Sequence, residues 1–323
     1  MMGPLRVMAA EQQIALLFVL VFGLLFLASV GALLLSLRDS TPARALRQAR
    51  VSRDLRALWL MTCGFWLAWI SGPVIACLLF AVVSFLALRE LITLMHTRRS
   101  DHRSLILIFF LVLPAQYVIV AVEGYGLFEV FIPVYVFLAI PVISALSGDP
   151  RNFLERNAKI HWGVMVCVYG LSHAPALLGL DLPRFNGRGA FLLFFLFTVT
   201  VVAQQVQEWV SRRLRSKPTA RHISRSFSTR AWFIGSFVAA WVGALLYWAT
   251  PFKPAQALLI GFATAASGML GDFVMRALKR DAGVDHWGNA PAVTGAVGLL
   301  DRIAPLCFAA PVFFHLLRWL YKV

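Results

Sequence analysis

The chain has 323 residues, of which 60% are hydrophobic and only 14% are charged, and its mean hydropathy is +0.76. Soluble globular proteins carry about 25% charged residues, so this composition excludes a soluble domain and indicates a membrane protein. The formal net charge is +15, from 30 basic and 15 acidic residues. Basic loops that face anionic lipid account for such an excess, so nucleic-acid binding is not needed to explain it.

Apolar runs of about 20 residues, the length that crosses about 30 Å of hydrocarbon, recur along the chain. We predict about ten spans, near residues 13–36, 57–71, 74–92, 104–122, 126–146, 161–180, 189–210, 231–249, 255–275 and 301–321. Only "SGP" at 71–73 separates the second span from the third, so nine spans remain possible. The first run is too long for a cleaved signal peptide, so we expect it to span with the N-terminus outside. The expected fold is an all-α polytopic integral membrane protein with nine or ten transmembrane helices and short cytoplasmic loops.

Basic residues gather on one side of the predicted topology. If the chain alternates sides, about 24 of the 30 basic residues fall in the segments after spans one, three, five, seven and nine. Cytoplasmic loops carry this bias, so we expect those segments to face the cytoplasm. We divide the chain into residues 1–56, a first helix with a basic linker, and residues 57–323, a membrane domain.

Cysteine and histidine spacing indicates no metal motif. The four cysteines are dispersed and all fall inside predicted spans, which favours buried thiols over zinc ligands or disulfides: Cys63, Cys77, Cys167 and Cys307. His173 and His315 also lie inside spans, where we expect neutral rings bonded to backbone carbonyls or across helices.

The stretch "GDFVMRALKRDAGVDHWGN" at 271–289 is one of the most charged in the chain. Asp272 lies at the predicted cytoplasmic end of a span, about one turn inside the interface. A carboxylate in that position is costly unless it is paired, and by default it is a functional candidate. If the helix continues, Arg276 and either Lys279 or Arg280 lie on the same face as Asp272.

Asp301 and Arg302 begin the last span, so two carboxylates and several cations meet at one membrane level. Two interpretations stay open. The carboxylates could bind Mg²⁺ while the cations neutralise a polyphosphate. Alternatively, they form two interfacial salt bridges, Asp272 with Arg276 and Asp301 with Arg302 or a neighbour.

The segments "GDFVMRALKRDAGV", "LLDRI" and "CFAAPVFFH" resemble the C-terminal signature of the phosphatidate cytidylyltransferase (CDP-diacylglycerol synthase) family. "FLALREL", "TRRSDHR" and "YGLFEVFIPVY" are similar to upstream segments of the bacterial branch. The resemblance covers nearly the whole chain from about residue 50 onward.

The resemblance implies that CTP and phosphatidic acid react to give CDP-diacylglycerol and pyrophosphate, with Mg²⁺. It implies metal ligation by Asp272 and Asp301, which together with Lys279 would form the catalytic set. Substrate-binding residues implied by the same matching are Lys279, Arg280, Arg302, Arg276, Ser224 and Gln205. It also implies the cytoplasmic membrane of a bacterium, a site that faces the cytoplasm, and a homodimer.

Several positions depart from the family pattern. Arg276 stands in place of a serine, Phe227 in place of a lysine, and Gln205 in place of an aspartate. Arg230 replaces a glutamate and Ala304 the second aspartate of the DRxD motif. Asp285 and His286 stand at the KD aspartate, and "TGAVG" at the HGG segment.

Phe227 cannot neutralise a triphosphate, and Arg276 could take the space and charge role of a metal ion. Two alternatives therefore stay open beside the family reaction: a non-catalytic relative that binds lipid or regulates a partner, and a transferase that acts on another phospholipid headgroup. A transporter is disfavoured because the sequence has no inverted repeat and no charge at mid-membrane depth.

Overall fold

The computed structural model is helical, and no strand occurs among the residues that it describes, which are 6, 8–37, 42–95, 97–183, 185, 187–214, 217–224, 226–284, 287 and 298–323. Eight helices in this part of the chain are long and apolar enough to cross a membrane. The predicted all-α polytopic membrane fold is therefore confirmed. The chain forms two compact units, Met1–Ser71 and Gly72–Val323. The predicted boundary after residue 56 was placed at the end of the basic linker, and it stays a prediction.

The first unit pairs α2 (Ala10–Ser36) with the first part of α3 (Pro42–Leu94). Trp59 Nε1 donates to Ser29 Oγ at 3.0 Å, which ties the two helices together. The rings of Phe18 and Phe22 pack against Trp66 at centroid distances of 5.1 and 6.3 Å. Most other apolar side chains of α2 are exposed, as expected of a helix that faces lipid.

Helix α3 breaks at Gly72, where φ is 84° and ψ is 171°. Only glycine adopts these angles without strain, and Pro73 then begins the next helical segment. The helical stretch Asp54–Leu94 has 41 residues, about 60 Å at 1.5 Å per residue, so it holds both the second and third predicted spans. The predicted span 231–249 is the shorter helix α11 (Thr229–Leu245), with 17 residues.

The first helices of the second unit contain π turns. The stretch 99–121 comprises η1 (Arg99–Asp101), α4 (His102–Leu107), η2 (Ile108–Val112) and α5 (Leu113–Ala121). The next stretches are α6 (Tyr125–Val130), η3 (Phe131–Val136) and α7 (Phe137–Ala145), then α8 (Phe153–Gly163), η4 (Val164–Gly170), α9 (Leu171–Ala176) and η5 (Leu177–Gly179). Pro114 follows η2 and Pro133 lies within η3. Since proline lacks an N–H and clashes with the preceding turn, it explains the widened turns there.

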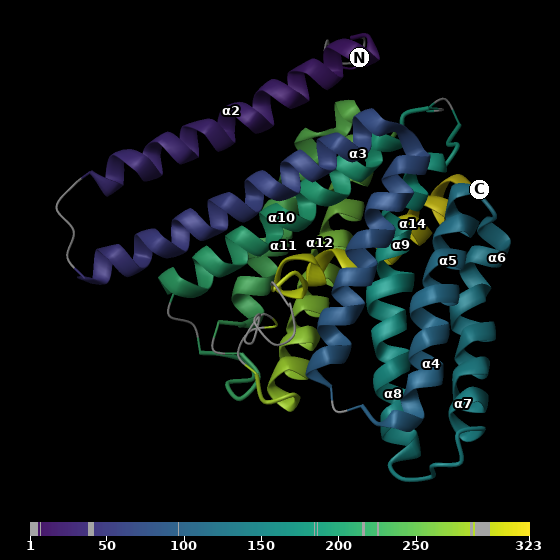
Figure 1. Ribbon diagram of the computed structural model, residues 1–323. Helices are drawn as coiled ribbons and strands as arrows, with labels where there is room; N and C mark the ends of the chain where they lie inside the picture. The colour runs from purple at the N-terminus through teal and green to yellow at the C-terminus, as the bar shows by residue number, and fades with distance from the viewer. Residues whose placement is uncertain are drawn as a thin grey trace. The chain divides into compact units, whose positions relative to one another are not determined.

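The second half of this unit holds the candidate site. Helices α10 (Gly189–Leu214), α11 and α12 (Pro254–Asp281) lie side by side, with η6 (Tyr247–Ala249) between the last two (Figure 1). Helix α14 (Leu300–Tyr321) packs against α12, α10 and α9, so it touches both groups of helices. Its buried residues include Phe313 and Phe314, whose rings pack on Phe195 and on Phe128 respectively.

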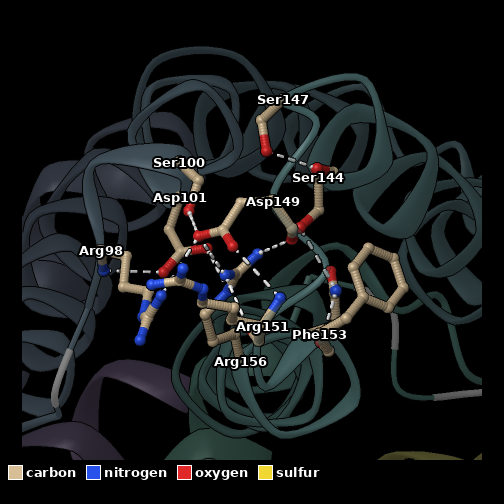
Figure 2. A network of polar contacts seen from close by, with 10 residues as sticks. Arg98, Ser100, Asp101, Ser144, Ser147, Asp149, Arg151, Phe153 and Arg156 are labelled. Atoms are coloured by element: carbon tan, nitrogen blue, oxygen red, sulfur yellow. Dashed lines mark hydrogen bonds and ion pairs between the residues drawn. The ribbon is translucent and has the colours of Figure 1, made fainter.

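A buried arginine joins two loops at the end of this unit where α8 begins (Figure 2). Arg156 pairs through Nε with Asp101 Oδ1 at 2.9 Å and through Nη1 with Asp149 Oδ2 at 2.9 Å. The Arg151 N–H, the Ser100 hydroxyl, Arg156 and Arg98 hold the pKa of the Asp149 carboxyl below its usual value. The network fixes the loops before α4 and α8 relative to each other.

We predict that Arg156→Gln lowers the free energy of unfolding by about 3–5 kcal/mol, because it leaves the buried Asp101 carboxylate without its cation. Arg98→Gln is the matched control. It removes another cation from Asp149, but Arg98 is 43% exposed, so the loss is below about 1 kcal/mol. Thermal unfolding of both variants in detergent checks this, and equal losses would contradict it.

Candidate functional site

Helices α12 and α14 cross in close contact beside Asp272. A Cβ at Gly268 would lie 2.9 Å from the Pro305 carbonyl oxygen, and a Cβ at Gly271 would overlap the Phe308 ring. The small residues of α12 thus permit a close approach between the two helices. At Gly271 the space next to Asp272 is filled by Phe308. The crossing places the end of α12 beside the start of α14.

Asp272 is paired with Arg276 from the next turn of α12. Its Oδ2 accepts from Arg276 Nε at 2.8 Å and from Nη2 at 2.7 Å. The Asp272 side chain is only 10% exposed, so this carboxylate is removed from water and neutralised by its own helix. The Asp272–Arg276 salt bridge expected from the sequence is present, and the Mg²⁺ interpretation stays a prediction.

Arg276 also contacts the segment between α10 and α11. Its Nη1 donates to Ser226 Oγ at 2.8 Å and lies 3.5 Å from Ser224 Oγ. Ser224 Oγ in turn accepts from the Phe227 backbone N–H at 3.2 Å. The Phe227 ring stacks on Phe273 with a centroid distance of 4.2 Å. Ser224, Ser226 and Phe227 are thus tied to α12 by hydrogen bonds from Arg276 and by an aromatic contact.

Asp301, the first acidic residue of α14, pairs with Lys279 of α12. Lys279 Nζ donates to Asp301 Oδ1, and the buried Trp287 donates its backbone N–H to Asp301 Oδ2 at 3.3 Å. The expected salt bridge of Asp301 is therefore made by a neighbour 22 residues earlier in the chain. The charge of Arg276 also interacts with those of Asp301 and Glu208. Asp272 and Asp301 therefore belong to one charged region.

Glu90 belongs to this region, and the sequence analysis did not single it out. Its Oε1 accepts from Gly298 N at 2.7 Å, and its Oε2 from Leu299 N at 2.8 Å and Leu300 N at 3.2 Å. A carboxylate at a helix N-terminus satisfies the unpaired amides and complements the helix dipole. Glu90 therefore holds the first turn of α14, and Asp301 with it. Its position inside an apolar span was the available signal.

The remaining predicted residues are placed differently. Ser224 is buried within the anchored segment, and Arg302 is half-buried at the start of α14. Arg280 is exposed near the C-terminal end of α12. Gln205 is exposed on α10, one turn before the exposed Trp209. Their roles stay predictions.

The positions that depart from the family pattern can be placed in part. Ala304 is buried in α14, whereas Arg230 is exposed in the first turn of α11. Asp285 and His286 lie outside the described residues, as does all of "TGAVG" except Gly298.

Within the described part of the chain, the histidines and cysteines belong to no cluster of metal ligands. No group of three or more potential ligands close enough to share an ion occurs within the described ranges. His173 is buried with Nδ1 2.7 Å from the Tyr169 carbonyl oxygen, as predicted. His315 Nδ1 lies 3.6 Å from Glu129 Oε1. All four cysteines are free thiols, but Cys63 is exposed in the first unit, so the prediction that every thiol is buried is wrong there.

We predict that Gly271→Ala lowers the free energy of unfolding by about 1–3 kcal/mol, because the new methyl group forces Phe308 and α14 away from α12. Gly126→Ala is the control, since a Cβ there meets nothing within 4 Å. A double variant with Phe308→Ala should recover part of the loss. Unchanged thermal unfolding of Gly271→Ala would contradict the close crossing.

We also predict that Glu90→Gln costs about 1.5–3 kcal/mol, the range for hydrogen bonds to a charged acceptor. Amide hydrogen exchange at Gly298, Leu299 and Leu300 should accelerate with it, because their acceptor loses its charge. Glu155→Gln, at an exposed i,i+4 pair, is the control. Unchanged exchange at these amides would show that Glu90 does not hold the helix start.

Comparisons with known proteins identify the family of the chain. A family model described as "Cytidylyltransferase family" matches residues 51–320, which include Glu90 and both aspartates. The protein YnbB of Escherichia coli (strain K12), described as uncharacterized, is 34% identical over 274 residues, covering 83% of this chain and 88% of that protein. The match extends over most of the chain and all of the charged region. The chain therefore belongs to the cytidylyltransferase family, which is the family of the phosphatidate cytidylyltransferases.

Proposed function

We propose that the chain transfers the cytidylyl group of CTP to phosphatidic acid, giving CDP-diacylglycerol and pyrophosphate. The observation that carries this proposal is the Lys279–Asp301 pair at the start of α14, where Glu90 caps the backbone amides. It supplies a cation for phosphate oxygens beside a carboxylate, at the edge of the apolar part of the chain. Family membership supports the reaction class, and the two substrates are the proposed part.

In the proposed reaction, a phosphate oxygen of phosphatidic acid attacks the α-phosphorus of CTP. The new P–O bond forms as the bond to the bridging β-phosphate oxygen breaks, and pyrophosphate carries away the electron pair. Such reactions depend on positioning and charge neutralisation more than on covalent catalysis. The Lys279 ammonium binds phosphate oxygens, and Asp301 orients Lys279. Exposed Arg280 and half-buried Arg302 add positive charge at the same level.

We propose Mg²⁺ as the cofactor, with Asp301 as its candidate protein ligand, because Asp272 is already paired with Arg276. The donor set fits an ion that arrives with the nucleotide, because Mg²⁺ at such sites takes one or two carboxylates and completes its shell with phosphates and water. When bound, Mg²⁺ would neutralise the developing charge on the triphosphate. No all-protein cage is required, and none is present among the described side chains.

We place the chain in the inner membrane of a bacterium, with the proposed site facing the cytoplasm. The basic segments flanking α12 and α14 support this side, since positive loops stay in the cytoplasm, where CTP is found. A homodimer is proposed from family membership alone.

A second candidate function is binding of phosphatidic acid without transfer. Two observations favour it: Phe227, at a position the family fills with lysine, is packed on Phe273, and the charge of Asp272 is already neutralised by Arg276. Phe227 supplies no cation for a triphosphate, and the neutralised Asp272 is less able to hold the metal ion that accompanies one. A transferase for another phospholipid headgroup would share the Lys279–Asp301 pair.

Conversion of radiolabelled CTP and phosphatidic acid into a CDP-lipid by the purified chain in detergent with Mg²⁺ tests the proposal. We expect turnover that falls at least about 100-fold in Asp301→Asn and in Lys279→Met, the range for loss of an electrostatic catalytic group. Lys159→Met is the matched control, because that lysine lies in an exposed pair with Glu155 on α8. No turnover by the unchanged chain, with phosphatidic acid still raising its melting temperature, would favour the second candidate.

A further inference from the structure

Asp272 already has a cation in the position that a metal ion would need. Arg276 Nε and Nη2 both donate to Asp272 Oδ2, at 2.8 and 2.7 Å. A divalent ion bound to the same carboxylate would lie within a few ångströms of the guanidinium. Repulsion between the two cations is strong where the side chains are shielded from water, as the 10% exposure of Asp272 indicates here.

Arg276 is also held in place from its other side. Its Nη1 donates to Ser226 Oγ at 2.8 Å, so the planar guanidinium bridges α12 and the segment before α11. Phe227 follows Ser226 in the sequence and Phe273 follows Asp272, and the rings of these two phenylalanines stack on each other. Turning Arg276 away to admit a metal ion would therefore break bonds to both Asp272 and Ser226.

We propose that Arg276 is a built-in counter-ion of Asp272, so that this carboxylate binds no divalent cation and the site takes a single one, at Asp301. Arg276 acts as a positioning residue: it neutralises Asp272 permanently and holds Ser224 and Ser226 against α12. The inference deepens the proposed function and rests on it for the presence of a divalent cation.

Asp301 differs from Asp272 in two respects that suit a metal ligand. Its side chain is 24% exposed, so an ion can reach it from water. Lys279, which donates to it, carries a single ammonium on a flexible stem, which can follow incoming phosphate groups. The rigid fork of Arg276 has no such freedom.

Thermal unfolding of the purified full-length chain in detergent, in EDTA and in Mn²⁺, tests the inference without nucleotide or lipid. The variants are Asp272→Asn, Arg276→Gln, the double variant and Asp301→Asn, with Glu155→Gln as an exposed-pair control. In EDTA, each single change at the Asp272–Arg276 pair should lower the melting temperature by roughly 5–10 °C. The double variant should lose less than the sum, because neither partner is left alone.

The Mn²⁺ response separates a counter-ion from a purely structural salt bridge. Asp272→Asn should keep the response of the unchanged chain, whatever its size. Arg276→Gln should gain a stabilisation by Mn²⁺ that vanishes in the double variant, because Asp272 then becomes available to the ion. Loss of the wild-type response in Asp272→Asn, no gain in Arg276→Gln, or strictly additive losses in EDTA would each overturn the inference.

These outcomes are independent of turnover. A chain that makes no CDP-lipid in the radiolabel assay still reports on Arg276 through its melting temperature. Conversely, an active chain whose Mn²⁺ response depends on Asp272 would keep the proposed function and lose this inference.

Discussion

A carboxylate buried at the edge of hydrocarbon must have a partner within the protein, since water no longer solvates it. The candidate site of this chain is organised around that requirement. Asp272 pairs with Arg276, Asp301 with Lys279, and Glu90 with the backbone amides that open α14. These three interactions hold adjoining parts of α3, α12 and α14 together, and they fix the positions of the charged side chains before any substrate binds.

The contacts depend on how closely the helices approach. Gly268 and Gly271 have no side chain, so the Pro305 carbonyl and the Phe308 ring of α14 lie directly against α12, and Lys279 of one helix reaches Asp301 of the other. The departures from the family pattern have a common physical effect on the α11 side of the site. Arg276 and Phe227 both make their contacts within the protein, and together they tie Ser226 and Phe227 to α12.

The sequence predicted the spans, because hydrocarbon thickness acts on each segment separately. It also predicted the Asp272–Arg276 pair, because i,i+4 spacing within a helix is local. It could not predict that Glu90 caps α14, since those partners are 208 to 210 residues apart and depend on tertiary packing. Gln205 was chosen by matching positions to the family, which takes no account of the helix face, and it is exposed. The partner of Asp301 was left open because Lys279 and Asp301 lie 22 residues apart and meet only through tertiary packing.

The most direct test of the account is the position of manganese in an experimental structure of the chain with Mn²⁺ and a non-hydrolysable CTP analogue. The anomalous scattering of manganese identifies the ion without reference to any assumed ligand. The account predicts one manganese peak against Asp301, with the Arg276 guanidinium still on Asp272 and Ser226. A peak within coordination distance of Asp272, with Arg276 turned away, would contradict it.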